Sequence, residues 1–348
     1  MSNGIPLAKR DLGPTLAREG GWLIMSLEDR SRVLLTASKD RGAAVKSLFE
    51  GAGLIGSNTA EAGRPDTTGS SRSEAPFTEL AGKSVAIKAN FNSADPFPAS
   101  THLDTLRAIV DVLNEAEAAR IVLAERSGMG DTRENLERLG LFALSGELGF
   151  EVVVLDEEPK DRWLHIERGE THWLRGFYLA KVFLEADVVI QTCCAKTHRY
   201  GGHFTMSLKN SVGLVAKRLP GGVYDYMGEL HVSPYQRLMI AEVNNFYPVD
   251  LVVMDAAKVF VSGGPDKGTE AEPGLMLASR DRVAIDAAGV ALLREYGMSK
   301  DADKPIFQLD QLRRAAELGV GAASASAIDL VPLDERGREA AERIRAHL

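Results

Sequence analysis

The sequence predicts an α/β fold with a mostly parallel sheet and helices on both faces of that sheet. Short β-branched and apolar runs alternate along the chain with segments of helical period, which is typical of parallel sheets. The 33 glycines suit many strand-to-helix turns. A length of 348 residues exceeds what one compact core usually holds, so one large domain with an insertion, or two lobes, would each fit.

Each element is assigned from its local pattern, in chain order. Strands are expected where apolar and β-branched residues cluster, at 31–37, 83–92, 120–125, 151–155, 187–192, 250–254 and 258–262. Helices are expected where apolar residues recur at helical spacing, at 41–52, 102–118, 131–144 (as two short segments), 176–185, 204–214, 281–294 and 334–348. The unit of strand, helix, strand and helix recurs without an internal sequence repeat.

These elements divide the chain into three parts. Residues 1–30 form an N-terminal extension, 31–300 an α/β domain, and 301–348 a C-terminal helical segment. Within the domain, 57–82 is predicted to be a mobile surface loop. Its first part is rich in Ser, Thr, Gly and charge and has no hydrophobic period.

Composition excludes several classes of protein. A formal net charge of -8 argues against a broad nucleic-acid-binding face. No apolar run approaches the roughly 18 residues of a membrane span, and the N-terminus lacks the apolar core of a signal peptide, so a cytoplasmic location is expected. A homo-oligomer is compatible with the sequence, with the apolar cluster at 22–25 as a candidate subunit contact. Nucleotide-binding glycine loops and the common zinc-peptidase and serine-hydrolase motifs do not occur.

A dense group of reactive side chains follows the strand predicted at 187–192. The group comprises Cys193, Cys194, Lys196, Thr197, His198, His203, Lys209 and Asn210. Open α/β sheets bind their ligands at the carboxyl ends of strands. Lys88 and Asn90 follow a second predicted strand and Asp255 a third, so we expect all of these residues to line one polar cleft.

The residue types favour an enzyme that binds a small carboxylate- or phosphate-bearing metabolite. Lys88, Lys196 and Lys209 would hold the anion, because lysines near strand ends and helix N-termini concentrate positive charge. The polar residues Asn90, Thr197 and Asn210 would complete the ligand-binding set. His198 or His203 would then transfer a proton and Asp255 would orient the histidine.

Two alternatives remain open at this stage. In the first, His198 and His203 bind a divalent metal or a redox cofactor, with a third ligand from Asp255, Glu125 or His231 and a contribution from Cys193 or Cys194. Neighbouring strand residues point to opposite faces, which argues against both thiols reaching one site, and an iron-sulfur cluster takes four thiolates, more than one copy of the chain supplies. In the second alternative the cleft belongs to a ligand-sensing module without turnover.

Two acidic residues of the helix at 281–294 have different expected roles. Asp281 is well placed to cap the helix N-terminus. Asp286 lies within an Ala-rich packed stretch, where a carboxylate needs a partner, and Lys209 or a backbone amide would serve.

Several short motifs together resemble a known family. They are VAIKANFN at 85–92, KTH at 196–198, SLKNSVG at 207–213, VMDA at 253–256, GGP at 263–265 and SRDRVAIDA at 279–287. Over roughly residues 32–296 the chain is similar to the domain of unknown function 362 family. The resemblance implies a shared α/β domain but little about activity, because the family is largely uncharacterised. Some of its members are fused to ferredoxin-type iron-sulfur domains, and this chain lacks their cysteine pattern.

Overall fold

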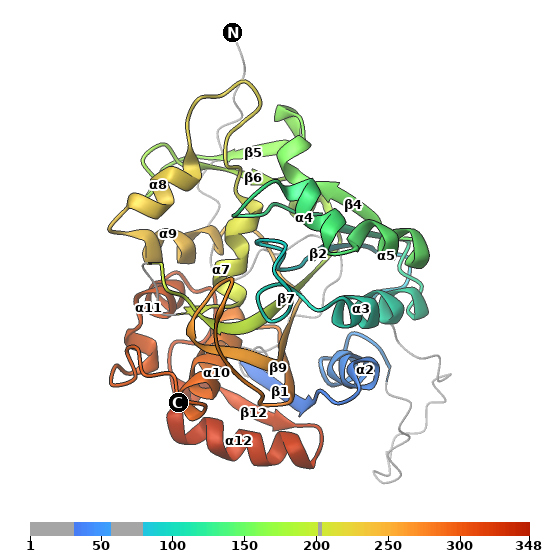
Figure 1. Ribbon diagram of the computed structural model, residues 1–348, viewed down its shortest axis with the longest axis vertical. Helices are drawn as coiled ribbons and strands as arrows, with labels where there is room; N and C mark the ends of the chain where they lie inside the picture. The colour runs from blue at the N-terminus through green and yellow to red at the C-terminus, as the bar shows by residue number, and fades with distance from the viewer. Residues whose placement is uncertain (1–30, 57–78, 201–203) are drawn as a thin grey trace, which may run out of the picture.

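The computed structural model describes residues 31–56, 79–200 and 204–348. Their strands form one large, mostly parallel sheet with helices on both faces, which confirms the predicted α/β fold (Figure 1). In spatial order the main strands are β12 (Asp329–Pro332), β1 (Arg32–Ala37), β11 (Leu275–Ser279), β9 (Leu251–Gly263), β7 (Val188–Thr197), β2 (Ser84–Lys88), β3 (Arg120–Glu125) and β4 (Glu151–Val154). Short strands β8 (Phe204–Thr205) and β10 (Gly268–Ala271) pair with β7 and β9. The predicted extension 1–30 and residues 57–78 of the predicted loop lie outside the described residues.

The central part of the sheet is parallel, and β11 is the exception among the main strands. β7 pairs in parallel with both β2 and β9, and β3 continues the parallel order from β2 to β4. β11 runs antiparallel between β1 and β9. The carboxyl ends of β2, β3 and β7 therefore lie at one edge of the sheet, where polar residues follow each strand.

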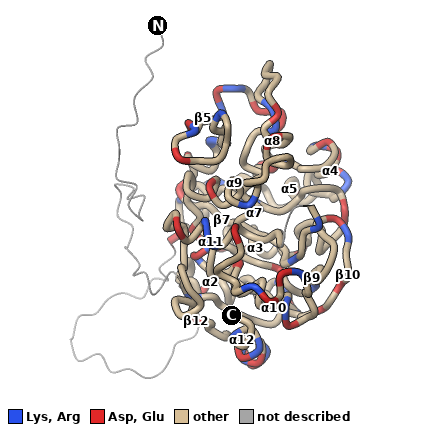
Figure 2. The backbone as a smooth tube through the Cα atoms, turned by 90° about the vertical axis from the view of Figure 1, so that its left-hand side faces the viewer, with Lys and Arg blue, Asp and Glu red and all other residues tan. Residues whose placement is uncertain are grey.

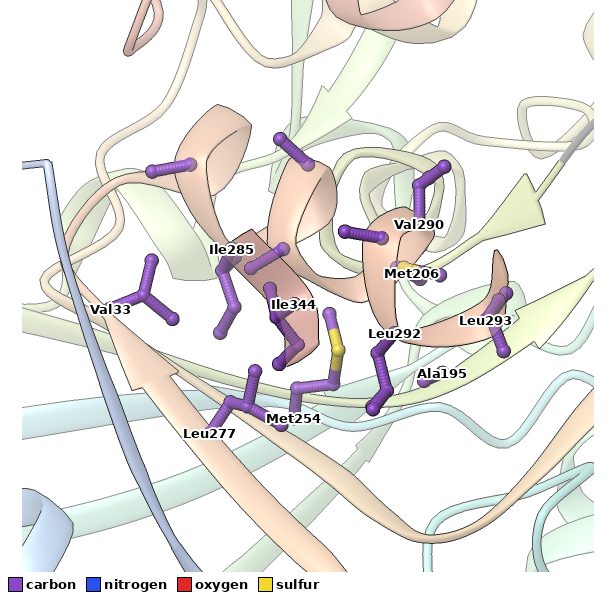
Figure 3. Close-up of a cluster of buried hydrophobic side chains, with 14 of the residues drawn as sticks. Val33, Ala195, Met206, Met254, Leu277, Ile285, Val290, Leu292, Leu293 and Ile344 are labelled. Atoms are coloured by element: carbon purple, nitrogen blue, oxygen red, sulfur yellow. The ribbon is translucent and has the colours of Figure 1, made fainter. Parts of the chain in front are cut away.

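The helices pack on both faces because strand residues alternate in direction. The helices are α2 (Arg41–Gly51), α3 (Leu103–Glu115), α4 (Thr132–Arg138), α5 (Leu141–Leu148), α6 (Val182–Glu185), α7 (Ser207–Asn210), α8 (Tyr226–Val232), α9 (Gln236–Val243), α10 (Arg282–Glu295), α11 (Asp310–Glu317) and α12 (Glu335–His347). Val253 of β9 packs in the cluster that contains α2 and α3, whereas Met254 packs in the cluster that contains α10 and α12. Figure 3 shows Ile285 and Leu292 of α10 facing Met254 and Leu277 of the strands below.

A third apolar cluster lies under α8 and α9. It includes the hairpin of β5 (Trp163–Ile166) and β6 (Phe177–Ala180), and Ala86 and Val189 connect it to the sheet. The prediction of one helix over 176–185 is therefore wrong for its first half. Phe177 and Tyr178 favour an extended chain and pair with β5, so that only Val182–Glu185 forms a helical turn.

The strands around the candidate site are longer than the sequence predicts. β7 does not end at Thr192 but continues to Thr197, and all ten of its residues are buried. The ranges 250–254 and 258–262, predicted as two strands, form the single strand β9. A register shift between Cys194 and Lys196 keeps β9 paired with β7 along this extension. In addition, β8 pairs with β7, and both β10 and β11 pair with β9. The residues from Cys193 to Thr197 thus belong to a strand and not to a loop.

Two features of the whole chain complete the fold. The segment 301–348 supplies strand β12 as well as helices, and β12 pairs in parallel with β1. Acidic and basic residues are interspersed along the described chain (Figure 2). No helix in the described ranges combines the length and the apolar character needed to cross a bilayer.

Candidate functional site

A cavity of about 280 Å³ opens where β2, β3 and β7 end. Five of the residues predicted from the sequence line it: Lys88, Asn90, His198, Lys209 and Asn210. The structure adds residues after β3, from α8 and from the turn that contains Pro265. The structure brings these five residues together around one cavity: Lys88, Asn90 and His198 lie at or after the ends of β2 and β7, and Lys209 and Asn210 lie on α7.

Lys88 is a buried cation of the cavity with three hydrogen-bond acceptors. Its Nζ donates to Glu125 Oε1 at 2.6 Å, to the carbonyl of Ala89 at 2.5 Å and to Asn210 Oδ1 at 3.1 Å. Burial lowers the pKa of Lys88, and the adjacent Glu125 carboxylate opposes that effect. Three acceptors use all three N–H groups of an ammonium, so Lys88 is held charged and positions its neighbours.

A glycine makes room for this lysine. A Cβ at Gly213 would lie 2.5 Å from Lys88 Cε and 2.8 Å from its Nζ, closer than such atoms approach. The turn that follows α7 can therefore lie against the ion pair only because residue 213 has no side chain.

Glu125 and Arg126 also line the cavity; the sequence suggested Glu125 only as a candidate metal ligand and did not identify Arg126. Glu125 accepts the backbone N–H of Phe91 at 3.1 Å and that of Arg126 at 2.9 Å in addition to Lys88. The Arg126 side chain donates to the carbonyls of Val215 and Val212, and burial lowers its pKa. The available signal was their place directly after an apolar strand, the same signal that identified Lys88.

Lys209 differs from the other lysines near the cavity. It lies on α7, is partly exposed to the cavity, and has no hydrogen-bond or ion-pair partner in the part of the chain that the structure describes. Burial lowers the pKa of Lys209 to about 7, and the charges of Arg237, Lys196 and Arg126 add to the effect. The Lys209 amine can therefore lose its proton far more readily than an exposed lysine.

Asp286 fixes the helix that carries Lys209. Its two carboxylate oxygens accept the backbone N–H groups of Ser207 at 2.8 Å and Leu208 at 3.0 Å. The prediction that Asp286 needs a partner is confirmed, and the partners are backbone amides and not Lys209. Burial raises the pKa of Asp286 to about 7. Asp281 caps α10 as predicted, accepting from Val283 and Ala284.

His198 is neutral in this environment. Its Nδ1 lies 2.9 Å from the carbonyl oxygen of Tyr200, and because a carbonyl only accepts, Nδ1 carries the proton and Nε2 keeps its lone pair. Burial and the charges of Lys209 and Arg237 hold the pKa of His198 far below its usual range. His203, the second predicted histidine, lies outside the described residues.

Three predicted site residues do not line the cavity. Lys196 Nζ donates to the carbonyls of Pro98, at 3.0 Å, and Ala99. Thr197 Oγ1 donates to the carbonyl of Phe260 at 3.2 Å. Asp255 accepts from Arg41 Nε at 3.1 Å, Thr105 Oγ1 at 2.6 Å and the N–H of Ala257 at 3.0 Å.

These three residues have partners away from the cavity because β7 and β9 extend past the predicted strand ends. The Lys196 side chain faces the segment before α3, that of Thr197 faces β9, and that of Asp255 contacts α2 and α3.

The two cysteines occupy opposite sides of β7, as expected. Cys193 packs in the core cluster with Met254, whereas Cys194 Sγ lies 3.4 Å from the carbonyl of Ser100 and 3.9 Å from Asn90 Nδ2. Burial raises the pKa of both thiols, that of Cys194 to about 11. Within 31–56, 79–200 and 204–348, no three His, Cys, Asp or Glu side chains converge in a way that could hold a metal ion.

The cavity therefore combines a positive field with the Lys209 amine, which has no partner among the described residues. Lys88 and Arg126 are charged and Glu125 balances one of them, while Lys209 can gain a proton. Neutral acceptors and hydroxyls, including His198 Nε2 and Thr205 Oγ1, have no partner in the described part of the chain. Such an arrangement can bind an anion and exchange a proton with it.

A known protein family matches the central part of the chain. Residues 85–291 match the family described as Domain of unknown function (DUF362). No curated protein matches the chain. The matched region runs from β2 into α10 and contains all the cavity residues named above.

Proposed function

The chain belongs to the family of domain of unknown function 362, and from that premise we propose that it is an enzyme that binds a small anionic metabolite in the cavity. The ligand would carry a carboxylate or a phosphate group. The observation that carries the proposal is the amine of Lys209, which lines a cavity of net positive charge without a partner of its own among the described residues.

An anion bound beside Lys209 would favour the protonated form of its amine. In the free protein, burial and three neighbouring cations lower the pKa of Lys209 to about 7. A carboxylate or phosphate beside Nζ would offset those charges and raise the pKa again. Lys209 would then take up a proton and donate charge-assisted hydrogen bonds to the ligand.

Lys209 is also the better candidate for proton transfer. A general acid or base works best when its pKa lies near the working pH, and the pKa of Lys209 meets that condition whereas that of His198 lies far below it. His198 would serve as a neutral hydrogen-bond acceptor through Nε2. Lys88 would supply charge without direct donation, because its N–H groups are already used.

Calorimetric titration with small carboxylates and with inorganic phosphate tests the proposal. At pH 8 the wild type should bind at least one of these anions with net proton uptake, measured in buffers of different ionisation enthalpy. The Lys209→Met variant should bind at least about tenfold more weakly and without proton uptake. Lys46→Met, which changes an exposed lysine paired with Glu115, should behave as the wild type. Equal affinity in the Lys209→Met variant would refute the role of this cavity.

A further inference from the structure

Lys88, Lys196 and Lys209 are all buried or partly buried, and they differ in what their amines do. Lys88 donates to three oxygens and Lys196 to two carbonyls. Lys209 has no acceptor in the described ranges. A nucleophilic amine needs a free lone pair and an open approach, and of these three only Lys209 has both.

The surroundings of Lys209 keep its amine in the reactive form. Arg237, Lys196 and Arg126 all disfavour a further positive charge at Nζ, and the neighbouring His198 is neutral. Placement in an apolar pocket or beside other cations is how proteins activate lysine for attack on carbonyl carbons. The cavity wall includes the apolar residues Phe91, Val212 and Met227.

The same cavity suits a particular class of electrophile. A volume of about 280 Å³ lies just below the range usual for ligand pockets and admits only a small molecule. The positive charges of Lys88 and Arg126 would attract an anionic group on that molecule. His198 Nε2 and Thr205 Oγ1, both at the cavity and unpartnered in the described part of the chain, can accept hydrogen bonds from a molecule bound there.

We infer that Lys209 forms an imine with a small anionic carbonyl compound, of which a 2-oxo acid is the simplest kind. This inference rests on the proposed function and names its substrate class. The Nζ lone pair forms the bond to the carbonyl carbon, and the π electrons of that carbonyl move to its oxygen. The oxygen then leaves as water with the two protons that the amine gives up. The imine remains, and hydrolysis by one water restores the lysine and the carbonyl compound.

Reductive trapping tests this step on the full chain. The protein is incubated with pyruvate and sodium cyanoborohydride near neutral pH, and adducts are located by intact mass and peptide mapping. We expect a stoichiometric adduct on Lys209 with the mass of the keto acid less one oxygen atom. The adduct should be lost in Lys209→Arg and kept in Lys46→Arg. Lactate, which has the carboxylate but no carbonyl, should slow its formation.

Thermal shifts with the same probes separate the two proposals. If pyruvate and lactate both stabilise the protein but pyruvate gives no adduct at Lys209, the imine is refuted and anion binding stands. If neither probe stabilises the protein and no adduct forms, both proposals fail for 2-oxo and 2-hydroxy acids. An adduct spread evenly over exposed lysines also refutes the imine. Circular dichroism of Lys209→Arg and of Lys209→Met ensures that loss of the adduct is not loss of the fold.

Discussion

At the scale of single residues, the buried amine of Lys209 lowers the free energy of unfolding, because burial and neighbouring cations disfavour its charged form. In the unfolded chain this lysine has its ordinary pKa of 10.5, whereas in the folded protein its pKa is about 7. The unfolded state therefore binds more protons between these values, and stability rises with pH across that window. Below pH 7 the full penalty is present, and above about pH 10.5 it is gone.

Replacing Lys209 with Met should make the protein more stable. Met fills a similar volume and has no charge to desolvate. At pH 6 we expect the free energy of unfolding to rise by about 1–3 kcal/mol, a discounted value because the amine reaches cavity water. Between pH 7 and 10 the variant should lose the upward slope of the wild type. Urea unfolding at several pH values measures both effects, and a less stable variant at pH 6 would contradict the assignment.

The individual lysines show what sequence can and cannot establish about the site. Their predicted places, near strand ends for Lys88 and Lys196 and near a helix N-terminus for Lys209, identified these lysines as one group. Their different roles depend on partners distant in sequence, such as Glu125 for Lys88 and the carbonyl of Pro98 for Lys196. No local pattern specifies those contacts, so sequence alone could not show that Lys209 would have no partner among the described residues.

At the scale of elements, α7 depends on its neighbours for its position. A helix of four residues is too short to be stable alone, and α7 packs against α9, α10 and β7 near the centre of the molecule (Figure 1). Asp286 of α10 supplies the acceptors for its first N–H groups. Asp286 thus links the long packed helix to the residue that we place in contact with the ligand.

Substituting Asp286 with Asn should weaken this link. Asn offers one oxygen, so one of the two buried N–H groups loses its acceptor and faces an NH₂ group. We expect a loss of about 1–3 kcal/mol in the free energy of unfolding. The exposed Asp111→Asn should change it by less than about 0.5 kcal/mol.

The pH dependence provides a second readout for Asp286. Because its folded pKa of about 7 exceeds the unfolded value of 3.8, the wild-type contribution to stability declines as pH rises between them. The Asn variant should lack that decline, and an unchanged slope would show that Asp286 does not titrate there.

The turn after α7 gives a matched pair of glycine substitutions. In Gly213→Ala the new methyl would displace Lys88 from Glu125 and Asn210, and we expect a loss of about 1–3 kcal/mol. Gly146→Ala, in α5 with nothing within 4 Å, should instead stabilise the protein by about 0.5–1 kcal/mol. Thermal unfolding of both variants tests the close approach, and similar behaviour would argue against it.

Element lengths near the site show the limit of local periodicity. The pattern of 187–192 correctly indicated a buried strand, but it could not predict the extension to Thr197. That extension requires pairing with β9 and β8, which come later in the chain. Likewise the strand Phe177–Ala180 forms only because β5 offers a partner. Pairing with other strands, and not the intrinsic strand propensity of these residues, therefore decided where β6 begins and where β7 ends.

At the scale of the whole molecule, the sheet extends beyond the region matched to the family. The match covers residues 85–291, yet β1 lies between β11 and β12, which bind its two edges. In Figure 1, β12 and α12 lie at the opposite end from β5 and α8. Helix α12 contributes Ala340, Ala341 and Ile344 to the same core cluster as α10. The segments on either side of the family match are thus built into one core.

This shared core predicts cooperative unfolding, which a substitution in α12 can test. Ile344 is fully buried against the cluster shown in Figure 3, so Ile344→Ala should cost about 2–5 kcal/mol. Because the core is continuous, the whole transition should shift, and far- and near-ultraviolet dichroism should report the same lowered midpoint. The exposed Glu342→Ala on the same helix should leave the midpoint nearly unchanged. If α12 were a separate appendage, Ile344→Ala would instead produce an early transition of small amplitude, with the main midpoint unaltered.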